Sequence, residues 1–405
     1  MKKTTWLAAC MAAACALALV IGCSSETEPV AVERVTLNAA TLTLSPGATG
    51  KLTATVLPEN ADDKTVTWSS SDTEVATVGE DGTLTAVSIG EATITARAGG
   101  KEATCAVTVC VHSYSGDRCT KCGFPKPVLE DGEIDDDGVL TKYSGNEATV
   151  VIPDGVTGIK WGAFEDCTAL TDVTIPASVT SIGVDAFRNC GNLKTVAYGG
   201  TLAQWCALDA YYLMAYAGQV TMSDGTDLKH MPTLAIPDGA RSIGDGAFKN
   251  CAALTSVTIP ASVVIVGGRA FADCTGLTDV TIPEGVTDIG FSAFWGCTSL
   301  VSVEIPGSVT SIGNSAFRGC TSLAGVKIPE GVTKIGNSAF FMCTNLTSVT
   351  IPASVTEIGR QAFYGCTSLT TINYTGTEAQ WNAITKGSDW DTCTGCYTIT
   401  YNYTE

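Results

Sequence analysis

The 405-residue sequence has few of the side chains that most enzymes need. It contains only two histidines, His112 and His230, and it has neither a nucleophile-elbow motif nor a glycine-rich phosphate loop. Its carboxylates fall in turns, without the paired arrangement that general acid–base catalysis requires. The sequence therefore predicts a protein without catalytic activity and with no required cofactor.

Positive charge is scarce as well. The chain has 23 Lys and Arg against 41 Asp and Glu, a formal net charge of −18, and no basic run. Nucleic acids and anionic membrane surfaces bind clustered Lys and Arg, so neither is expected as a direct partner. The acidity suits the solubility of a long surface protein.

Long apolar runs are missing after the first thirty residues, and no later segment approaches the roughly 20 residues needed to cross a bilayer. At the start of the chain, Lys2 and Lys3 precede an apolar stretch, Trp6–Ile21. This layout is typical of a secretory signal that is removed from the mature protein.

The end of that stretch, Val20–Cys23, resembles a bacterial lipobox. The resemblance implies a signal peptide over 1–22, lipid attachment at Cys23, a polar tether over 23–31 and an exported, membrane-anchored surface lipoprotein. A plain signal peptide followed by an incidental cysteine is the alternative.

Residues 32–109 alternate apolar residues with Thr and Ser between turn signals, which predicts a β-sandwich of about eight short strands. The strands are expected at Arg34–Leu37, Thr41–Leu44, Lys51–Val56, Thr65–Ser69, Val75–Val78, Thr83–Val87, Ala92–Ala96 and Glu102–Val109. The predicted core consists of Leu52, Ala54, Val56, Val66, Trp68, Ile94, Val107 and Val109.

Four stretches of this segment carry a family resemblance: Thr67–Asp72, Val75–Val78, Gly82–Val87 and Gly90–Ala96. They resemble the bacterial immunoglobulin-like group 2 domain. The resemblance implies a spacer or an adhesive module of a surface protein, and the spacer role is the commoner one.

The linker, residues 110–127, contains a C-x-H pair, Cys110 and His112, and a C-x-x-C-G turn from Cys119 through Cys122 to Gly123. Three thiolates and one imidazole form a ligand set of tetrahedral structural zinc, and the pattern resembles a zinc-ribbon knuckle. Four protein ligands leave no open position for catalysis. A disulfide-tied linker and free thiols are the alternatives.

Acidic residues follow at Glu130–Gly138, inside the expected N-terminal cap of the next domain, residues 128–149. As a calcium loop this segment is poor, because Ser144 falls where a bidentate Glu is required. We expect an exposed acidic turn.

A 23-residue repeat dominates the rest of the chain. Ile-Pro pairs begin at Ile152, Ile175, Ile236, Ile259, Ile282, Ile305, Ile328 and Ile351, and every step but one is 23 residues. An Ala-Phe pair and then a Cys recur in the same phase. A fixed period in the twenties predicts stacked units, so we expect a solenoid of short strands and short helical turns in two blocks, 150–196 and 234–371.

The consensus, L-x-x-V-x-I-P-x-x-V-x-x-I-G-x-x-A-F-x-x-C-x-x-L, resembles the BspA-like (treponemal-type) leucine-rich repeat from about residue 140 to 405. The resemblance implies a secreted or surface solenoid that adheres, in some relatives, to host matrix proteins or other cells. One cysteine per coil is expected to form a buried structural ladder, with a redox framework or metal wire as the alternative.

Two aromatic-rich segments interrupt or end the repeat, at 197–233 and 372–405. They share the pattern around Trp205 and Trp381, and Thr201 and Thr377 are each expected to cap a short helix without a full capping box. These tryptophans are candidates for exposed binding anchors. The alternative is that the aromatics seal the ends of the coil stacks. Cys393 and Cys396 form a second C-x-x-C pair, expected to be a local disulfide or thiol pair.

If the strands line one concave sheet, its exposed positions form a hydroxyl-rich ligand-binding face suited to broad, weak, multivalent contact. These positions are Asp172, Thr174, Ser256, Thr258, Asp279, Thr281, Ser302, Glu304, Lys327, Ser348 and Thr350. The sequence thus predicts an adhesin-like surface protein that contacts an extracellular protein or glycan. A passive envelope scaffold or a glycan-binding module is the alternative.

Overall fold

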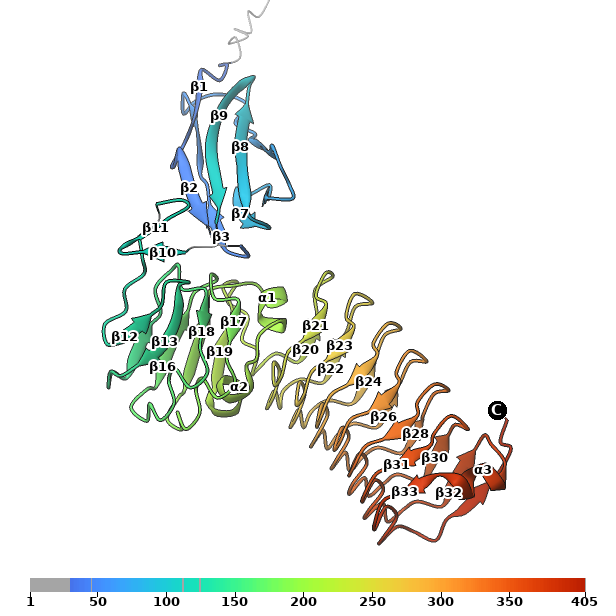
Figure 1. The fold of residues 1–405 in the computed structure, drawn as a ribbon. Coiled ribbons are helices and arrows are strands. Elements are labelled where there is room, and N and C mark those ends of the chain that lie inside the picture. The colour runs from blue at the N-terminus through green and yellow to red at the C-terminus, as the bar shows by residue number, and fades with distance from the viewer. Residues whose placement is uncertain (1–29, 45, 111–112, 124, 405) are drawn as a thin grey trace, which may run out of the picture.

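The computed structural model describes residues 30–44, 46–110, 113–123 and 125–404. The proposed signal and lipid-attachment residue Cys23 lie outside the described residues. As predicted, an immunoglobulin-like β-sandwich precedes a β-solenoid (Figure 1). Among the described residues, no helix is both long and apolar enough to cross a membrane.

The sandwich is built from nine short strands: β1 (Arg34–Leu37), β2 (Thr41–Leu44), β3 (Thr49–Lys51), β4 (Ala54–Leu57), β5 (Thr67–Ser70), β6 (Ala76–Val78), β7 (Thr83–Ala86), β8 (Gly90–Ala98) and β9 (Lys101–Val109). One sheet has the order β2-β9-β8-β5, a second has β3-β7-β6, and β1 pairs with β4. Of the predicted core, Ala54, Val66 and Trp68 are only partly buried and the other five are buried.

One strand prediction in the sandwich was wrong. The segment expected as a single strand, Lys51–Val56, is divided between β3 and β4. At the break, the backbone N–H of buried Leu52 donates to the Gly82 carbonyl at 3.0 Å. The next N–H, of Thr53, donates to the Asn38 side chain at 2.8 Å. At this break the chain passes from the β3-β7-β6 sheet to the β1-β4 pair.

The linker forms a small hairpin, β10 (Tyr114–Ser115) and β11 (Arg118–Cys119), and the solenoid cap forms another, β12 (Gly132–Ile134) and β13 (Val139–Tyr143). The acidic segment makes the turn of the second hairpin. There, the Asp135 carboxylate accepts hydrogen bonds from the N–H groups of Asp137 and Val139 at 3.0 and 2.9 Å.

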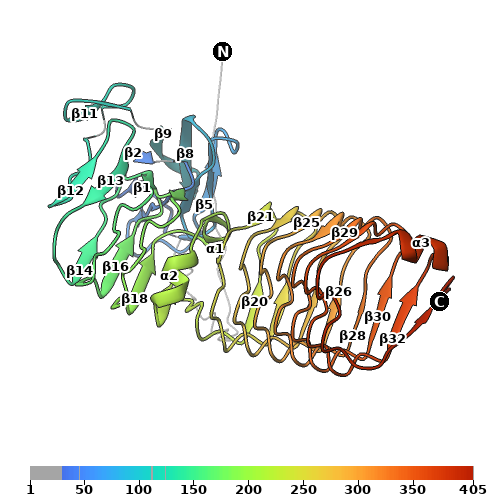
Figure 2. The ribbon, with the colours of Figure 1, turned by 60° about the horizontal axis from the view of Figure 1, so that its bottom comes forward.

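Each regular coil of the solenoid contributes strands to two parallel ladders (Figure 2). The first ladder is divided into three four-stranded sheets. They are formed by β14 (Thr149–Val151), β16 (Asp172–Ile175), β18 (Thr195–Tyr198) and β19 (Gln219–Thr221); by β20 (Thr233–Ala235), β22 (Ser256–Thr258), β24 (Asp279–Thr281) and β26 (Ser302–Glu304); and by β28 (Gly325–Lys327), β30 (Ser348–Ile351), β32 (Thr371–Tyr374) and β34 (Thr398–Thr400). Proline ends these strands in the regular coils, because it cannot continue a ladder.

The second ladder was not predicted. It consists of two-residue strands in two sheets. In the first block, β15 (Gly158–Ile159) and β17 (Ser181–Ile182) extend the sheet of the cap hairpin. In the second block, seven strands pair in order: β21 (Ser242–Ile243), β23 (Ile265–Val266), β25 (Asp288–Ile289), β27 (Ser311–Ile312), β29 (Lys334–Ile335), β31 (Glu357–Ile358) and β33 (Thr385–Lys386). Strands of this length are too short for alternation to be visible in the sequence. The expectation of a single sheet was therefore incomplete.

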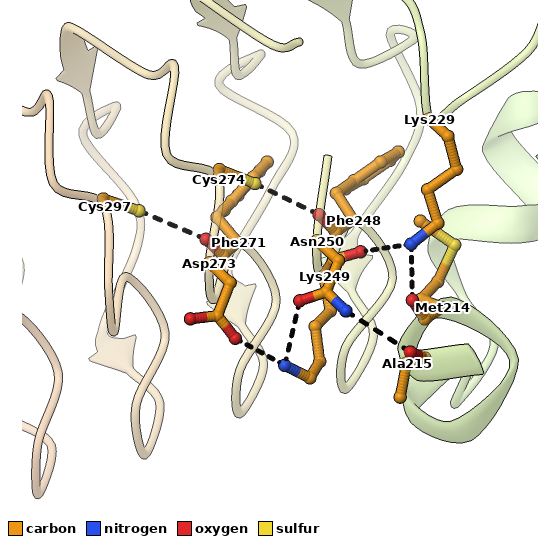
Figure 3. A network of polar contacts seen from close by, with 10 residues as sticks. All are labelled: Met214, Ala215, Lys229, Phe248, Lys249, Asn250, Phe271, Asp273, Cys274 and Cys297. Carbon is orange, nitrogen blue, oxygen red and sulfur yellow. Dashed lines mark hydrogen bonds and ion pairs between the residues drawn. The ribbon is translucent and has the colours of Figure 1, made fainter. Parts of the chain in front are cut away.

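Columns of identical side chains fill the solenoid. Phenylalanines of successive coils stack with centroids 4.8 to 5.5 Å apart and rings 2 to 14° from parallel. Each of six coil cysteines donates its thiol to the phenylalanine carbonyl of the preceding coil, at 3.0 to 3.2 Å, as Cys274 does to Phe248 (Figure 3). These cysteines therefore form the structural ladder that the repeat predicted.

Three short helices lie in the aromatic segments: α1 (Leu202–Cys206), α2 (Tyr211–Tyr216) and α3 (Glu378–Ala383). Thr201 caps α1 and Thr377 caps α3, and both helices have the full capping box. The expectation of an incomplete box was wrong, because Gln204 and Gln380 each stand at the third helical position and bond back to the cap N–H.

A buried lysine joins the first aromatic segment to the second repeat block. The Lys229 ammonium donates to the carbonyl oxygens of Met214 and Lys249 (Figure 3). Burial lowers the pKa of Lys229 to about 8. The side chain of Lys249 continues the network, because its ammonium group pairs with the Asp273 carboxylate at 2.6 Å.

Candidate functional site: two surfaces of the solenoid

The predicted ligand-binding face lies on the first ladder, where its side chains alternate with buried residues. Thr258, Asp279, Thr281, Ser302, Glu304 and Lys327 are exposed, whereas Asp172, Thr174, Ser256, Ser348 and Thr350 are partly covered by their neighbours. We call these eleven positions the strand face. It places hydroxyls and isolated charges in a row, but it offers little apolar area to a partner.

Several polar groups of the strand face are already engaged with each other. The Asp172 carboxylate accepts hydrogen bonds from the hydroxyls of Thr171 and Thr195, and these bonds lower its pKa. Thr281 donates to Glu304 at 3.4 Å. A ligand would have to replace such bonds, which limits the free energy that each new contact adds.

The two tryptophans predicted as binding anchors are not on the surface. Trp205 has an exposed fraction of 0% and donates its indole N–H to the Ala247 carbonyl at 2.8 Å. Trp381 is 5% exposed and packs its ring against Tyr374. Their assignment to a ligand-binding face was wrong, because both rings are packed inside the coil stacks.

A different surface carries exposed aromatic and cationic side chains. We call it the arginine–aromatic ridge and define it by Tyr211, Arg269, Phe291, Trp295, Arg318, Phe341 and Tyr364. Phe291 and Trp295 are 46% and 37% exposed. Arg318 is exposed, and the other four are partly exposed. The ridge runs from α2 across successive coils, on the turns around the Ala-Phe pairs.

Cation–π contacts order this ridge. The Arg269 guanidinium carbon lies 4.8 Å from the centre of the Tyr211 ring and 4.6 Å from that of Phe291. Arg318 lies 4.3 Å from the centre of Phe341. Phe341 in turn stacks on the Tyr364 ring of the next coil at 5.0 Å. The cationic groups are thus held at the surface with their positions fixed.

Two depressions adjoin Arg269. One lies along the ridge, lined by Arg269, Phe291, Ser292, Trp295, Ser315 and Arg318. The other lies where α2 meets the second block, lined by Val184, Asp185, Asp209, Tyr211, Tyr212, Asp245, Gly268 and Arg269. Burial raises the pKa of Asp209 in the second depression. The ridge therefore continues into an acidic pocket at the junction of the two blocks.

The sequence contains a signal for the ridge that periodicity alone overlooks. In the second repeat block, the position directly after the Ala-Phe pair holds Lys249, Ala272, Trp295, Arg318, Phe341 and Tyr364 in consecutive coils. A structural position in a repeat tends to keep one residue type, as the Phe and Cys columns do. In this column Lys249 and Ala272 are buried, whereas Trp295, Arg318, Phe341 and Tyr364 are exposed or partly exposed. A run of four variable basic and aromatic residues at one phase points to a surface.

The three linker cysteines also come together. The sulfur atoms of Cys110, Cys119 and Cys122 all lie within 4.8 Å of one another, and they are the one such group of possible metal ligands in the described ranges. His112, the predicted fourth ligand, lies outside the described residues. Cys393 and Cys396 are exposed.

Comparison with protein families assigns both folded parts. The family described as "BspA type Leucine rich repeat region" matches residues 142–206 and 241–370, with six copies of its repeat. The chain carries BspA-type leucine-rich repeats. Residues 31–109 match the bacterial Ig-like domain, group 2. Both resemblances found in the sequence are thereby confirmed.

Individual relatives match parts of the chain. An alpha-L-arabinofuranosidase of Bifidobacterium longum is 56% identical over 70 residues, which is 17% of this chain and 7% of that enzyme. A lacto-N-biosidase of Bifidobacterium bifidum is 37% identical over 128 residues, 30% of this chain and 11% of the enzyme. The matches span only a small part of each enzyme.

Among solved structures, a leucine-rich cell surface protein from Faecalibacterium prausnitzii is 27% identical. The similarity covers 63% of this chain and 95% of that one, with a TM-score of 0.27.

Proposed function

We propose that the protein is a non-catalytic cell-surface binding protein whose arginine–aromatic ridge holds an extracellular protein. The ridge is the observation that carries this proposal. Arg, Trp and Tyr dominate the residues whose truncation weakens protein interfaces most. Here they lie with Phe291 and Phe341 on one surface, of which Phe291, Trp295 and Arg318 are the exposed members.

The electrostatics favour a protein partner with an apolar and acidic patch. The chain as a whole is strongly acidic, whereas Arg269 and Arg318 put two positive charges among exposed rings. Because ring contacts already order both guanidinium groups, binding has less side-chain entropy to remove.

The remaining parts of the proposal concern export. The secretory layout before Cys23 supports a lipid anchor at that residue, and the F. prausnitzii relative is described as a cell surface protein. The Ig-like domain then serves as a spacer between anchor and solenoid. Replacing Cys23→Ala is expected to move the protein from the membrane fraction to the medium, and intact mass of the wild type tests for the lipid.

Binding is tested on immobilised host matrix proteins, mucin and a glycan array. Arg318→Glu is expected to abolish binding that the wild type shows. Lys327→Glu is the matched control, since it makes the same charge change at an exposed position of the strand face.

Loss of binding only in Lys327→Glu would transfer the function to the strand face. Binding restricted to the glycan array would replace the protein partner by a sugar. If the wild type binds none of the three surfaces, a passive envelope scaffold is favoured. Circular dichroism of both variants checks that the fold is kept.

A further inference from the structure

Few apolar side chains are buried in the part of the linker that the structure describes, which leaves out residues 111, 112 and 124. Its buried cluster consists of Cys110, Tyr114 and Cys119, with Cys122 packed against them, and it is separate from the clusters of both large domains. Folded units shorter than about 40 residues usually need a disulfide or a metal ion. In a cluster of three cysteines and one tyrosine, bonds made by the sulfur atoms would therefore add stability.

The sulfur positions fit a shared metal ion. The Sγ atoms of Cys110 and Cys119 are 3.9 Å apart, and all three sulfurs lie within 4.8 Å of one another. Tetrahedral zinc with Zn–S bonds of about 2.3 Å separates its sulfur ligands by about 3.8 Å. A disulfide needs about 2.05 Å and would use only two of the three thiols.

The backbone fixes these thiols independently of one another. Cys119 sits in the β10–β11 hairpin opposite Tyr114. The following turn brings Cys122 back beside it, because the Gly123 N–H donates to the Cys119 carbonyl at 2.9 Å. Gly123 has φ +72°, a conformation that side chains disfavour. Cys110 is placed at the end of β9, where its N–H donates to Leu44.

We propose that Cys110, Cys119 and Cys122 bind one structural zinc ion that fastens the Ig-like domain to the solenoid. Thiolates are soft ligands that favour zinc over magnesium or calcium. The sequence offers His112 as a fourth ligand; it lies outside the described residues, and the proposal rests on the three sulfurs.

The position of the hairpin explains why a metal would matter there. Figure 1 shows β10 and β11 between the sandwich and the cap strands β12 and β13. The Tyr114 N–H donates to the Asp136 carbonyl of the cap at 2.6 Å, and the Lys126 ammonium pairs with the Asp136 carboxylate at 2.9 Å. Since Cys110 directly follows β9, a zinc ion would connect the last strand of the sandwich to the linker hairpin, which is itself bonded to the solenoid cap through Asp136.

The test measures zinc in the purified protein by elemental analysis and X-ray absorption. We expect about one zinc ion per chain, with sulfur neighbours at about 2.3 Å. The double variant Cys119→Ser/Cys122→Ser should retain less than about a tenth of that zinc. Cys393→Ser/Cys396→Ser, which removes the other C-x-x-C pair, is the matched control and should retain all of it.

A second measurement does not depend on variants that fold. Wild-type protein is stripped with a chelator under reducing conditions and titrated with Co²⁺, and the expected result is a thiolate-to-cobalt charge-transfer band. The proposal is overturned by protein that binds neither metal, by zinc that persists in Cys119→Ser/Cys122→Ser, or by an intact mass that lacks two hydrogens lost to a disulfide between linker cysteines. Because the ridge takes no part in this site, failure here leaves the proposed binding function unaffected.

Discussion

The guanidinium of Arg318 lies over the ring of Phe341, one coil further along the solenoid, with 4.3 Å between the guanidinium carbon and the ring centre. The two residues occupy the same position of consecutive repeats, directly after an Ala-Phe pair. In a solenoid, any column of the repeat becomes a continuous line on the surface. A few substitutions at one phase can therefore change a binding surface without affecting the core.

Substitutions at two adjacent residues, one buried in the core and one on the ridge, should affect stability and partner binding differently. Phe294→Ala removes a fully buried ring of the stack and is expected to cost about 3–5 kcal/mol in the free energy of unfolding. Trp295→Ala alters a residue that is 37% exposed and should cost about 1 kcal/mol.

The same Trp295→Ala variant should weaken partner binding by about 2 kcal/mol or more if the ridge is the interface. Urea denaturation gives the first quantity and binding isotherms on the captured partner give the second. Equal binding by Trp295→Ala and the wild type would remove Trp295 from the proposed interface.

The coil cysteines should be unreactive until the solenoid unfolds. Burial raises the pKa of Cys297, Cys320 and Cys343 well above its usual range, and the thiolate is the reactive form. Native protein treated with iodoacetamide at pH 8 after reduction should carry the label at exposed Cys393 and Cys396. Peptide mass spectrometry locates the labels, and rapid labelling of Cys320 before unfolding would contradict this expectation.

The thiol hydrogen bonds should also contribute to stability. Cys320 donates to the Phe294 carbonyl at 3.2 Å inside the stack. Cys320→Ala removes this donor and leaves a small cavity, so we expect a loss of about 1–2 kcal/mol. Cys320→Ser keeps a donor of similar size and serves as the control. If Cys320→Ser lowers the free energy of unfolding more than Cys320→Ala does, burying a polar hydroxyl at this site costs more than the hydrogen bond contributes.

Most of the solenoid could be predicted from the sequence, because the same pattern of buried residues recurs in each coil. The Ile, Phe and Cys columns are where the 23-residue period places them. The aromatic segments were harder, since Trp205 occurs outside the period and hydrophobicity alone cannot tell a sealing ring from an exposed one. Its indole bond to Ala247 depends on the next repeat block, 42 residues later in the chain.

The ridge escaped prediction for a related reason. Phe291, between the buried Ile289 and Phe294, and Trp295, directly after Phe294, look like ordinary apolar residues in the sequence. Only the turn geometry shows that their side chains leave the core. The linker cysteines, in contrast, could be grouped from spacing alone, because a C-x-x-C turn brings two sulfurs together whatever surrounds it.

Lys229 should make the free energy of unfolding of the wild type change with pH in the alkaline range. Burial lowers its pKa from 10.5 to about 8. Between these values the unfolded chain binds a proton that the folded chain does not, so the free energy of unfolding rises as pH increases from about 8 to 10.5. The shift corresponds to about 3 kcal/mol. This destabilising contribution is fully present below pH 8 and is gone above 10.5.

The variant Lys229→Met cannot titrate at this position, so it isolates the effect. The free energy of unfolding of wild type minus that of Lys229→Met should increase with pH across this window. Buried thiols and tyrosines lower stability at alkaline pH in both proteins and cancel in the difference. Lys142→Met, at an exposed lysine of β13, controls for the loss of one positive charge. A difference that stays constant from pH 7.5 to 10.5, measured by urea denaturation, would mean that the two carbonyl bonds from Lys229 offset the cost of burying its charge.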